Sequence, residues 1–314
     1  MQTPTHFDVF VADGFVLTEL AGVVDVLRLV NRISARPIFE WHFRSLTGGT
    51  INSSSGAMVS TTPLPARPNA DYFVALGNSD ANARDLSLGA TIATYKSRQA
   101  RVVLLAEAAS RYIAETDDEA GLHTTHWENR AVLSERYGLF ETQSALAADT
   151  GPVITGAGMG ATVDLMLSLA GHHVPSTVLM TVSDVLLHER IRHHSTLQPF
   201  SGQSVLATGD AALDAAIALM QNNIEFPIPI SLIADETGLS KRSLERKFNR
   251  LLGTTPNGYY RALRLNKANN LLLNTDMRIH EIGLACGFPS GFTTIYRETF
   301  GVTPNAARRK GRTP

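Results

Sequence analysis

The stretch GLSKRSLERKFNRLLGTTP, residues 238–256, recurs in altered form as GFPSGFTTIYRETFGVTP at residues 287–304. Each copy has a glycine turn, an amphipathic segment and a closing Gly-x-Thr-Pro, and each follows a short apolar segment, at 232–234 and 279–285. Two short helices joined by a tight turn, with cations outward on the second helix, form the helix-turn-helix that places a helix in the DNA major groove. The repeat therefore predicts two tandem helix-turn-helix modules and a DNA-binding protein.

The first copy has the more basic outer face. On an ideal helix over residues 241–252, Leu244, Phe248 and Leu251 fall on one face and the polar residues on the other. Arginine can pair with guanine and asparagine with adenine, while other groups on such a helix contact phosphate. A charged run is more often only a solvated face, and the duplication is what favours DNA reading. The expected contacts are Ser240, Lys241, Arg242, Arg246, Asn249 and Arg250.

A longer helix is expected to join the two copies. Thr255 and Pro256 supply a capping hydroxyl and a proline suited to the first helical position. Apolar residues such as Leu263 and Leu272 would hold both modules on this helix, and Arg264 is expected to contact a phosphate.

The second copy is shorter and less basic. The interval from turn glycine to closing glycine is 14 residues (287 to 301), against 15 in the first copy (238 to 253). Its outward residues are Thr294, Arg297 and Glu298. We therefore expect Thr294 and Arg297 to make weaker or less specific DNA contacts.

The charge of the chain is divided unevenly along its length. Of its 314 residues, 227–314 hold 14 Lys and Arg against 6 Asp and Glu, a net +8, which leaves −9 for residues 1–226 and −1 for the whole chain. Phosphate neutralisation supplies most non-specific DNA affinity, so the asymmetry places that affinity in the C-terminal part.

One cysteine, Cys286, excludes an intramolecular disulfide and a cysteine-based metal cluster, and a reducing cytoplasm fits best. The N-terminus lacks the pattern of a signal peptide, and no apolar run of about 18 residues occurs. We expect a soluble, cytoplasmic protein with no membrane contact, no metal site and no cofactor.

The first part of the chain alternates strand and helix patterns. Strands are expected near residues 7–12, 41–46, 72–76 and 102–105, and helices near 17–31 and 88–97. This order predicts an α/β fold, a doubly wound, mostly parallel sheet with helices on both faces, followed by the all-α part with two helix-turn-helix modules. Ligands of such sheets bind beyond the carboxyl ends of the strands, and the first strand ends at Asp13.

The turn after the strand at 102–105 is where enzymes of this architecture hold a nucleophile on a sharp elbow. It reads Ala106, Glu107, Ala108, Ala109, with no Ser or Cys at the turn. Ser110 follows, and an ordinary helical serine explains it better than a nucleophile. No catalytic residue is therefore expected.

Two further segments could form a ligand site. In residues 124–127 (TTHW), His126 and the indole of Trp127 could line a polar site, Trp127 offering a cation-π face; the alternative is a strand with both side chains packed in the core. The glycine-rich residues 155–160 (TGAGMG) resemble a dinucleotide loop, but Gly156 and Gly158 lack the usual spacing, and tight strand-helix packing explains them equally well.

Residues 195–209 are polar, contain one Pro and two Gly, and separate the acidic part from the basic part. We expect domains at 1–195 and 210–314, with a linker at 196–209.

The second part resembles the AraC/XylS-type transcription regulators. The motifs G-L-S-x-R-x-L-x-R-x-F-x(4)-G-x-T-P at 238–256, R-L-x-x-A-x-x-L-L at 264–272 and I-x-E-I-x-x-x-x-G-F at 279–288 carry the resemblance. The family normally has a longer second module with an arginine where Thr294 stands here.

The first part, roughly residues 5–192, resembles the class I glutamine amidotransferase-like (PfpI-like) domain found on one branch of these regulators. Residues 124–127 and the glycine loop carry this resemblance, which places Ala106 where the enzymes have a cysteine. It implies a sensing and dimerising domain without the chemistry, and an amino acid or amine as effector. The expected ligand residues are Asp13, Glu107, His126, Trp127, Gly156 and Gly158.

We therefore expect a ligand-responsive, sequence-specific transcription regulator. Its partners would be promoter or operator DNA, a small-molecule effector, a second copy of the chain and, as a further candidate, RNA polymerase. The alternatives are an amidase- or peptidase-like enzyme with a DNA-binding tail, which needs a nucleophile, and an architectural protein that binds DNA without sequence preference.

Overall fold

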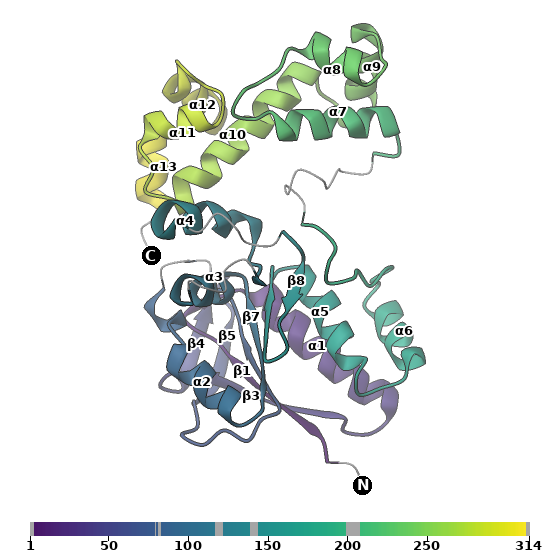
Figure 1. Cartoon of the computed structure of the whole chain (residues 1–314), viewed down its shortest axis with the longest axis vertical. Coiled ribbons are helices and arrows are strands. Elements are labelled where there is room, and N and C mark those ends of the chain that lie inside the picture. The colour runs from purple at the N-terminus through teal and green to yellow at the C-terminus, as the bar shows by residue number, and fades with distance from the viewer. Residues whose placement is uncertain are drawn as a thin grey trace. The chain divides into compact units, whose positions relative to one another are not determined.

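The computed structural model describes residues 3–78, 80, 83–116, 122–138, 144–198 and 208–311. Contacts divide the chain into two compact units, Met1–Gln198 and Pro199–Pro314, which are described separately (Figure 1). Of the linker expected at 196–209, residues 199–207 lie outside the described residues. None of the helices in the described ranges combines the length and apolar character needed to cross a lipid bilayer.

A sheet of nine strands forms the centre of the first unit, as far as its residues are described. The order is β2-β4-β5-β3-β1-β6-β7-β9-β8. The central strands β3, β1, β6, β7 and β9 pair in parallel, whereas β4–β5 and β8–β9 are antiparallel, so the predicted mostly parallel sheet is confirmed. The strands are β1 (Thr5–Phe10), β2 (Gly14–Phe15), β3 (Phe39–Ser45), β4 (Gly49–Ser53), β5 (Met58–Pro63), β6 (Tyr72–Ala75), β7 (Arg101–Leu105), β8 (Ala147–Asp149) and β9 (Val153–Gly156).

Helices cover both faces of this sheet, which is why β1 has buried apolar residues pointing to both sides. Phe7 and Val9 point into a core with α1 and α5, while Phe10 points into a second core with α2 and α3. Asp8, between them, is buried and accepts hydrogen bonds from Tyr95 and Arg44. The helices are α1 (Leu17–Ser34), η1 (Arg84–Leu86), α2 (Gly89–Ser97), α3 (Ala106–Glu115), α4 (Trp127–Tyr137), α5 (Ala161–Ala170) and α6 (Ser176–Val185).

The second unit contains the two predicted modules. The first is α8 with α9, the second is α11 with α12, and the long helix α10 runs between them (Figure 1). Its helices are α7 (Ala211–Asn222), α8 (Ile230–Glu236), α9 (Lys241–Leu252), α10 (Pro256–Asn274), α11 (Ile279–Ala285), α12 (Phe292–Phe300) and α13 (Pro304–Gly311).

Local signals set the ends of α9 and α10. The Ser240 hydroxyl accepts a hydrogen bond from the amide of Ser243 at 3.2 Å, and Thr255 caps α10 in the same way through the amide of Gly258 at 3.1 Å. Gly253 ends α9 with φ +65°, a left-handed conformation that favours glycine. The predicted starts of both helices are confirmed.

The apolar face predicted for α9 is only partly correct. Leu244 and Phe248 are fully buried, but Leu251 is 40 % exposed. Leu251 lies in the last turn of α9, one residue before the helix ends at Leu252.

The burial difference within α9 gives a test of its packing. Phe248→Ala should lower the free energy of unfolding by about 3–5 kcal/mol, because it removes a fully buried ring and leaves a cavity. Leu251→Ala, on the same helix, should cost less than about 1 kcal/mol. Urea unfolding of the full chain, followed by far-ultraviolet circular dichroism, measures both; equal losses would contradict this packing.

Candidate functional site

The outer face of α9 is exposed and basic. Lys247 is the exception, since it is half-buried and forms an ion pair with Asp210, the N-cap residue of α7. Among the described residues, the guanidinium groups of Arg242, Arg246 and Arg250 form no ion pair with a carboxylate. These groups are free to meet a polyanion. The exposed residues of the face are those expected to contact DNA: Ser240, Lys241, Arg242, Arg246, Asn249 and Arg250.

Arg264 does not have the role expected of it. Its Nη1 donates a hydrogen bond to the carbonyl oxygen of Gly287 at 2.9 Å, and its guanidinium lies 4.4 Å from the ring centre of Phe288 and 5.5 Å from that of Tyr260. Burial lowers the pKa of Arg264. The side chain fastens α10 to the turn between α11 and α12, so the expected phosphate contact is corrected to an internal one.

The second module presents a smaller surface. Helix α12 has 9 residues against 12 in α9, and Gly291, in the left-handed conformation, precedes it without a side-chain cap. Thr294 and Arg297 are both exposed on α12, as expected. The face therefore carries one cation where α9 carries several.

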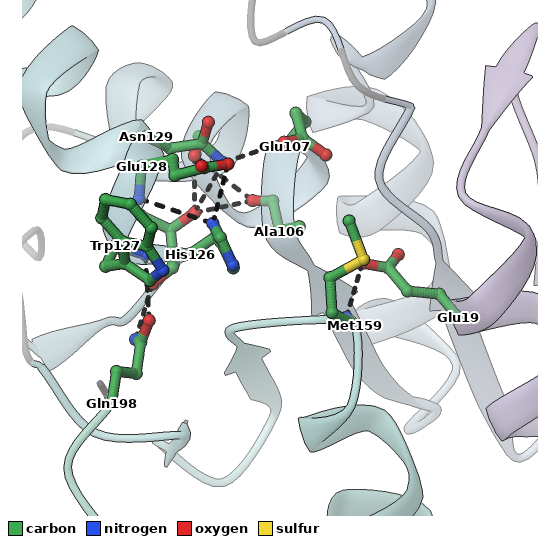
Figure 2. Close-up of polar contacts among 11 residues, drawn as sticks. Glu19, Ala106, Glu107, His126, Trp127, Glu128, Asn129, Met159 and Gln198 are labelled. Atoms are coloured by element: carbon green, nitrogen blue, oxygen red, sulfur yellow. Dashed lines mark hydrogen bonds and ion pairs between the residues drawn. The ribbon is translucent and has the colours of Figure 1, made fainter. Parts of the chain in front are cut away.

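In the first unit, the loops after β1, β6, β7 and β9 meet at the carboxyl edge of the sheet. The residues labelled in Figure 2 lie at or directly before the starts of α1, α3 and α4 and in the loop after β9, except Gln198, which ends the unit. We call Glu19, Ala106, Glu107, His126 and Trp127 the elbow site.

Ala106 occupies the sharp turn between β7 and α3. Its φ is +42°, a conformation that is costly for a residue with a side chain and is typical of a functional elbow. The carbonyl oxygen of Ala106 accepts a hydrogen bond from Thr125 Oγ1 at 2.7 Å. The elbow is thus present with a methyl group where a nucleophile would stand.

Ser110 does not replace the missing nucleophile. It is buried, and its hydroxyl lies 2.6 Å from Thr125 Oγ1 and 3.2 Å from the carbonyl oxygen of Ala106. These contacts lie inside the turn, so Ser110 supports the elbow backbone.

Glu19 is the central side chain of this edge. It lies near the start of α1 and is fully buried. Its Oε2 accepts the N–H of Gly77 at 2.8 Å, after β6, and its Oε1 accepts the N–H of Met159 at 3.0 Å, after β9 (Figure 2). Burial raises the pKa of Glu19 to about 7; the two backbone N–H groups oppose this rise and Glu107 adds to it.

The glycine loop is filled from within by Glu19. A Cβ on Gly158, whose φ is +74°, would lie 2.0 Å from Glu19 Oε1. Gly156 is buried, and a Cβ there would lie 3.0 Å from Leu105 Cδ2. A phosphate at this loop would face a carboxyl that already accepts the N–H of Met159. Both glycines serve close packing, and the ligand contact expected of Gly156 and Gly158 stays a prediction.

Glu107 is the half-buried acid of the elbow site. Its Oε1 accepts a hydrogen bond from Asn129 Nδ2 at 3.1 Å, whereas its Oε2 is buried and has no hydrogen-bond partner among the described residues. A buried carboxylate oxygen without a partner is costly, so this atom is an unused acceptor, and it lies against Gly77, where a Cβ would be 2.2 Å away.

His126 and Trp127 form the N-terminus of α4, not a strand as the packed alternative supposed. His126 Nδ1 accepts the N–H of Glu128 at 3.4 Å, and burial lowers the pKa of His126, which favours the neutral ring that this contact needs. The Trp127 ring is partly exposed and lies 5.6 Å from the imidazole, centre to centre.

Asp13 lies at the same edge but has its own contacts. It is exposed, and its Oδ1 accepts the N–H of Asn52 at 3.3 Å. The structure thus brings Glu107, His126 and Trp127 together, while Asp13 belongs to the loop between β1 and β2.

Sequence reasoning missed Glu19, although a signal exists. Glu19, Val23, Val26 and Val30 occupy the buried stripe of α1 at helical spacing. Acidic residues are almost never fully buried unless they are paired. A glutamate on the apolar stripe of a helix is therefore a signal of a buried carboxyl with partners, and this signal could have identified Glu19.

The family described as "Helix-turn-helix domain" has a sequence profile that matches residues 233–310. Over its length the chain is similar to the HTH-type transcriptional regulator GbdR of Pseudomonas aeruginosa strain UCBPP-PA14, with 30 % identity covering 98 % of this chain and 85 % of that protein.

Solved structures with a similar fold include two bacterial proteins. An AraC family transcriptional regulator from Pseudomonas putida is 21 % identical and covers 58 % of this chain and 100 % of its own, with a TM-score of 0.49. A ThiJ/PfpI family protein from Pseudomonas syringae is 16 % identical and covers 80 % of this chain and 92 % of its own, with a TM-score of 0.46.

The raised pKa of Glu19 ties stability to pH. Between about pH 4.5 and pH 7 the Glu19 carboxyl keeps its proton in the folded state but loses it in the unfolded chain. The contribution of Glu19 to the free energy of unfolding is therefore fully present at acid pH and is lost as the pH rises through 7. Relative to Glu19→Gln, which cannot titrate, the unmodified protein should lose up to about 3 kcal/mol of unfolding free energy between about pH 5 and pH 8. Urea unfolding across this range measures the difference, with the exposed Glu40→Gln as control. Parallel pH profiles for the protein and Glu19→Gln would refute the assignment.

Proposed function

The chain belongs to the AraC-type family of HTH transcriptional regulators and is a DNA-binding regulator, and from this premise we propose that its two units divide operator reading from effector sensing. In the proposal, α9 reads bases, α12 anchors the second module more weakly, and the elbow site binds a small molecule. The protein acts as a homodimer on promoter or operator DNA, and effector binding shifts its DNA affinity.

The exposed face of α9 is the observation that carries the DNA-reading part. Arg242, Arg246 and Asn249 present unpaired donors on a helix whose two ends are capped within the module. A recognition helix reads base edges with a few such side chains, while neighbouring cations contact phosphates. The shorter α12, with Thr294 and Arg297, would supply mainly phosphate contacts.

The elbow site supports a binding role without catalysis. The elbow has the backbone of a reactive turn but presents the methyl group of Ala106, and the nearby Ser110 hydroxyl is used inside the turn. Covalent catalysis at an elbow needs a thiol or hydroxyl there, so an amidase or peptidase function has no group to carry it.

The groups around Ala106 favour a cationic effector such as an amine, an amino acid or a betaine. Glu107 offers an unused carboxylate oxygen, Glu19 lies on the other side of the elbow, and Trp127 supplies an aromatic face. A cation held there would favour the ionised form of Glu19. Binding would then release a proton near neutral pH, and affinity would rise with pH.

Sequence-specific reading by α9 makes a prediction for base contacts. DNA selected from a random library by the full chain serves as the probe. Arg246→Ala should weaken binding to the selected sequence by about 1–3 kcal/mol and relax the base preference at one position, because a bidentate contact is lost. Arg28→Ala removes the same charge from the first unit and should leave binding unchanged. Equal weakening of selected and random DNA would instead indicate an architectural protein.

The effector proposal is tested by ligand-induced stabilisation of the full chain. A panel of amines, amino acids and betaines should contain a compound that raises the melting temperature, because it binds only the folded state. Glu107→Gln should lower the affinity for that compound about tenfold or more, as measured by calorimetry, since the loss of one charged contact costs about 1.5–3 kcal/mol. Glu40→Gln is the matched exposed control. No stabilisation by any compound, or unchanged affinity in Glu107→Gln, would refute the cationic effector.

A further inference from the structure

Gln198 is a buried polar side chain at the end of the first unit that the proposed function does not yet use. It is 2 % exposed, and its unit ends with it. Figure 2 shows its amide pointing at the start of α4, beside Trp127. Gln198 contacts the backbone N–H of Trp127, which lies 71 residues earlier in the chain.

The amide of Gln198 makes a full set of hydrogen bonds. Its Oε1 accepts the N–H of Trp127 at 2.9 Å. Its Nε2 donates to the carbonyl oxygens of Thr125 and Ala145, both at 2.8 Å, and to Thr124 Oγ1 at 3.2 Å. Each polar atom is used, so the network is of the kind that fixes a single local arrangement.

This contact supports the N-terminus of α4. The first N–H groups of a helix have no partner within the helix, and Trp127 is the first residue of α4. Gln198 therefore acts as a cap supplied from a distant part of the chain.

The backbone before Gln198 is tied to the same region. Its own N–H donates to the carbonyl oxygen of Ser144 at 2.8 Å, and the N–H of Leu146 donates to the carbonyl oxygen of Thr196 at 2.8 Å. The carbonyl oxygen of Leu146 also accepts the N–H of Ala157, which lies in the glycine loop two residues before Met159, at 2.8 Å. Residues 194–198 thus contact α4 directly, and through Leu146 they are linked to the loop held by Glu19.

We infer that Gln198 is a positioning residue of the elbow site, which holds Trp127 in place and links the state of that site to the segment at 194–198 that ends the first unit. The inference rests on the proposed effector function for its meaning. A change at the site that moves the start of α4 must strain or break the Gln198 contacts. The segment at 194–198 would then shift together with the start of α4.

Trp127 itself provides the readout for positioning. The chain has two tryptophans, so a Trp41→Phe background leaves Trp127 as the sole indole emitter. Gln198→Met keeps the length and removes the amide; it should shift the emission to longer wavelength and increase acrylamide quenching. Gln198→Glu can still accept the Trp127 N–H and, when protonated, donate to one carbonyl. It should therefore match the parent at acid pH; as the pH rises, the carboxylate keeps the Trp127 contact but repels the carbonyl oxygens of Thr125 and Ala145, so the emission should shift toward that of Gln198→Met.

The link to residues 194–198 is tested by hydrogen exchange without any ligand. Trp127→Ala, which disturbs the site but keeps the backbone N–H, should speed exchange of the amides of Leu146 and Gln198 about tenfold, because local opening costs less when the cap loosens. In the Gln198→Met background the same change should have less than about a twofold effect, since the link is already cut.

Three outcomes would overturn the inference. They are equal acceleration by Trp127→Ala in both backgrounds, unchanged Trp127 emission in Gln198→Met, and no pH-dependent recovery in Gln198→Glu relative to the parent over the same range. Circular dichroism of each variant establishes that it is folded, and Gln198→Glu at acid pH carries the test if Gln198→Met does not fold. Because no effector is present, failure here is distinct from failure of the effector proposal.

Discussion

The buried carboxyl of Glu19 is the interaction on which the carboxyl edge of the sheet depends. One side chain accepts N–H groups from Gly77 and Met159, so the start of α1 and the loops after β6 and β9 must keep fixed relative positions. Burying a carboxyl is costly unless its hydrogen bonds are made, and a single displaced loop would leave it unsatisfied. The absence of a side chain at Gly158 follows directly, because a Cβ there would overlap Glu19 Oε1.

The same constraint explains how the strained elbow at Ala106 persists. Ala106 keeps a positive φ, at a cost on the order of 1–3 kcal/mol, because β7, Thr125 and the Glu19-bound loops surround it. The retained geometry still brings Glu107 and Trp127 to one place. Gln198 extends this arrangement to the last residue of the unit.

In the second unit, burial distinguishes the side chains that hold the helices together from those that face solvent. On α9 the apolar residues Leu244 and Phe248 are fully buried and the arginines are exposed. On α10, by contrast, a cation is turned inward: the Arg264 guanidinium lies over the Phe288 ring and donates a hydrogen bond to the carbonyl oxygen of Gly287. A charge near DNA-reading helices is therefore not by itself a DNA contact. The long α10 with its Arg264 contact explains how two modules of unequal length form one unit.

Local patterns in the sequence were enough to predict the tandem modules, the mostly parallel sheet, the caps at Ser240 and Thr255 and the elbow at Ala106. They succeed because helix periodicity, strand alternation and capping depend on neighbours a few residues away. Only the tertiary structure decided the roles of Glu19, Gly156, Arg264 and Gln198. The partners of Glu19 lie 58 and 140 residues away, and those of the Gln198 side chain lie between 53 and 74 residues away. Which distant backbone groups meet a buried side chain is set by how strands are ordered and loops converge, and no local period encodes that order.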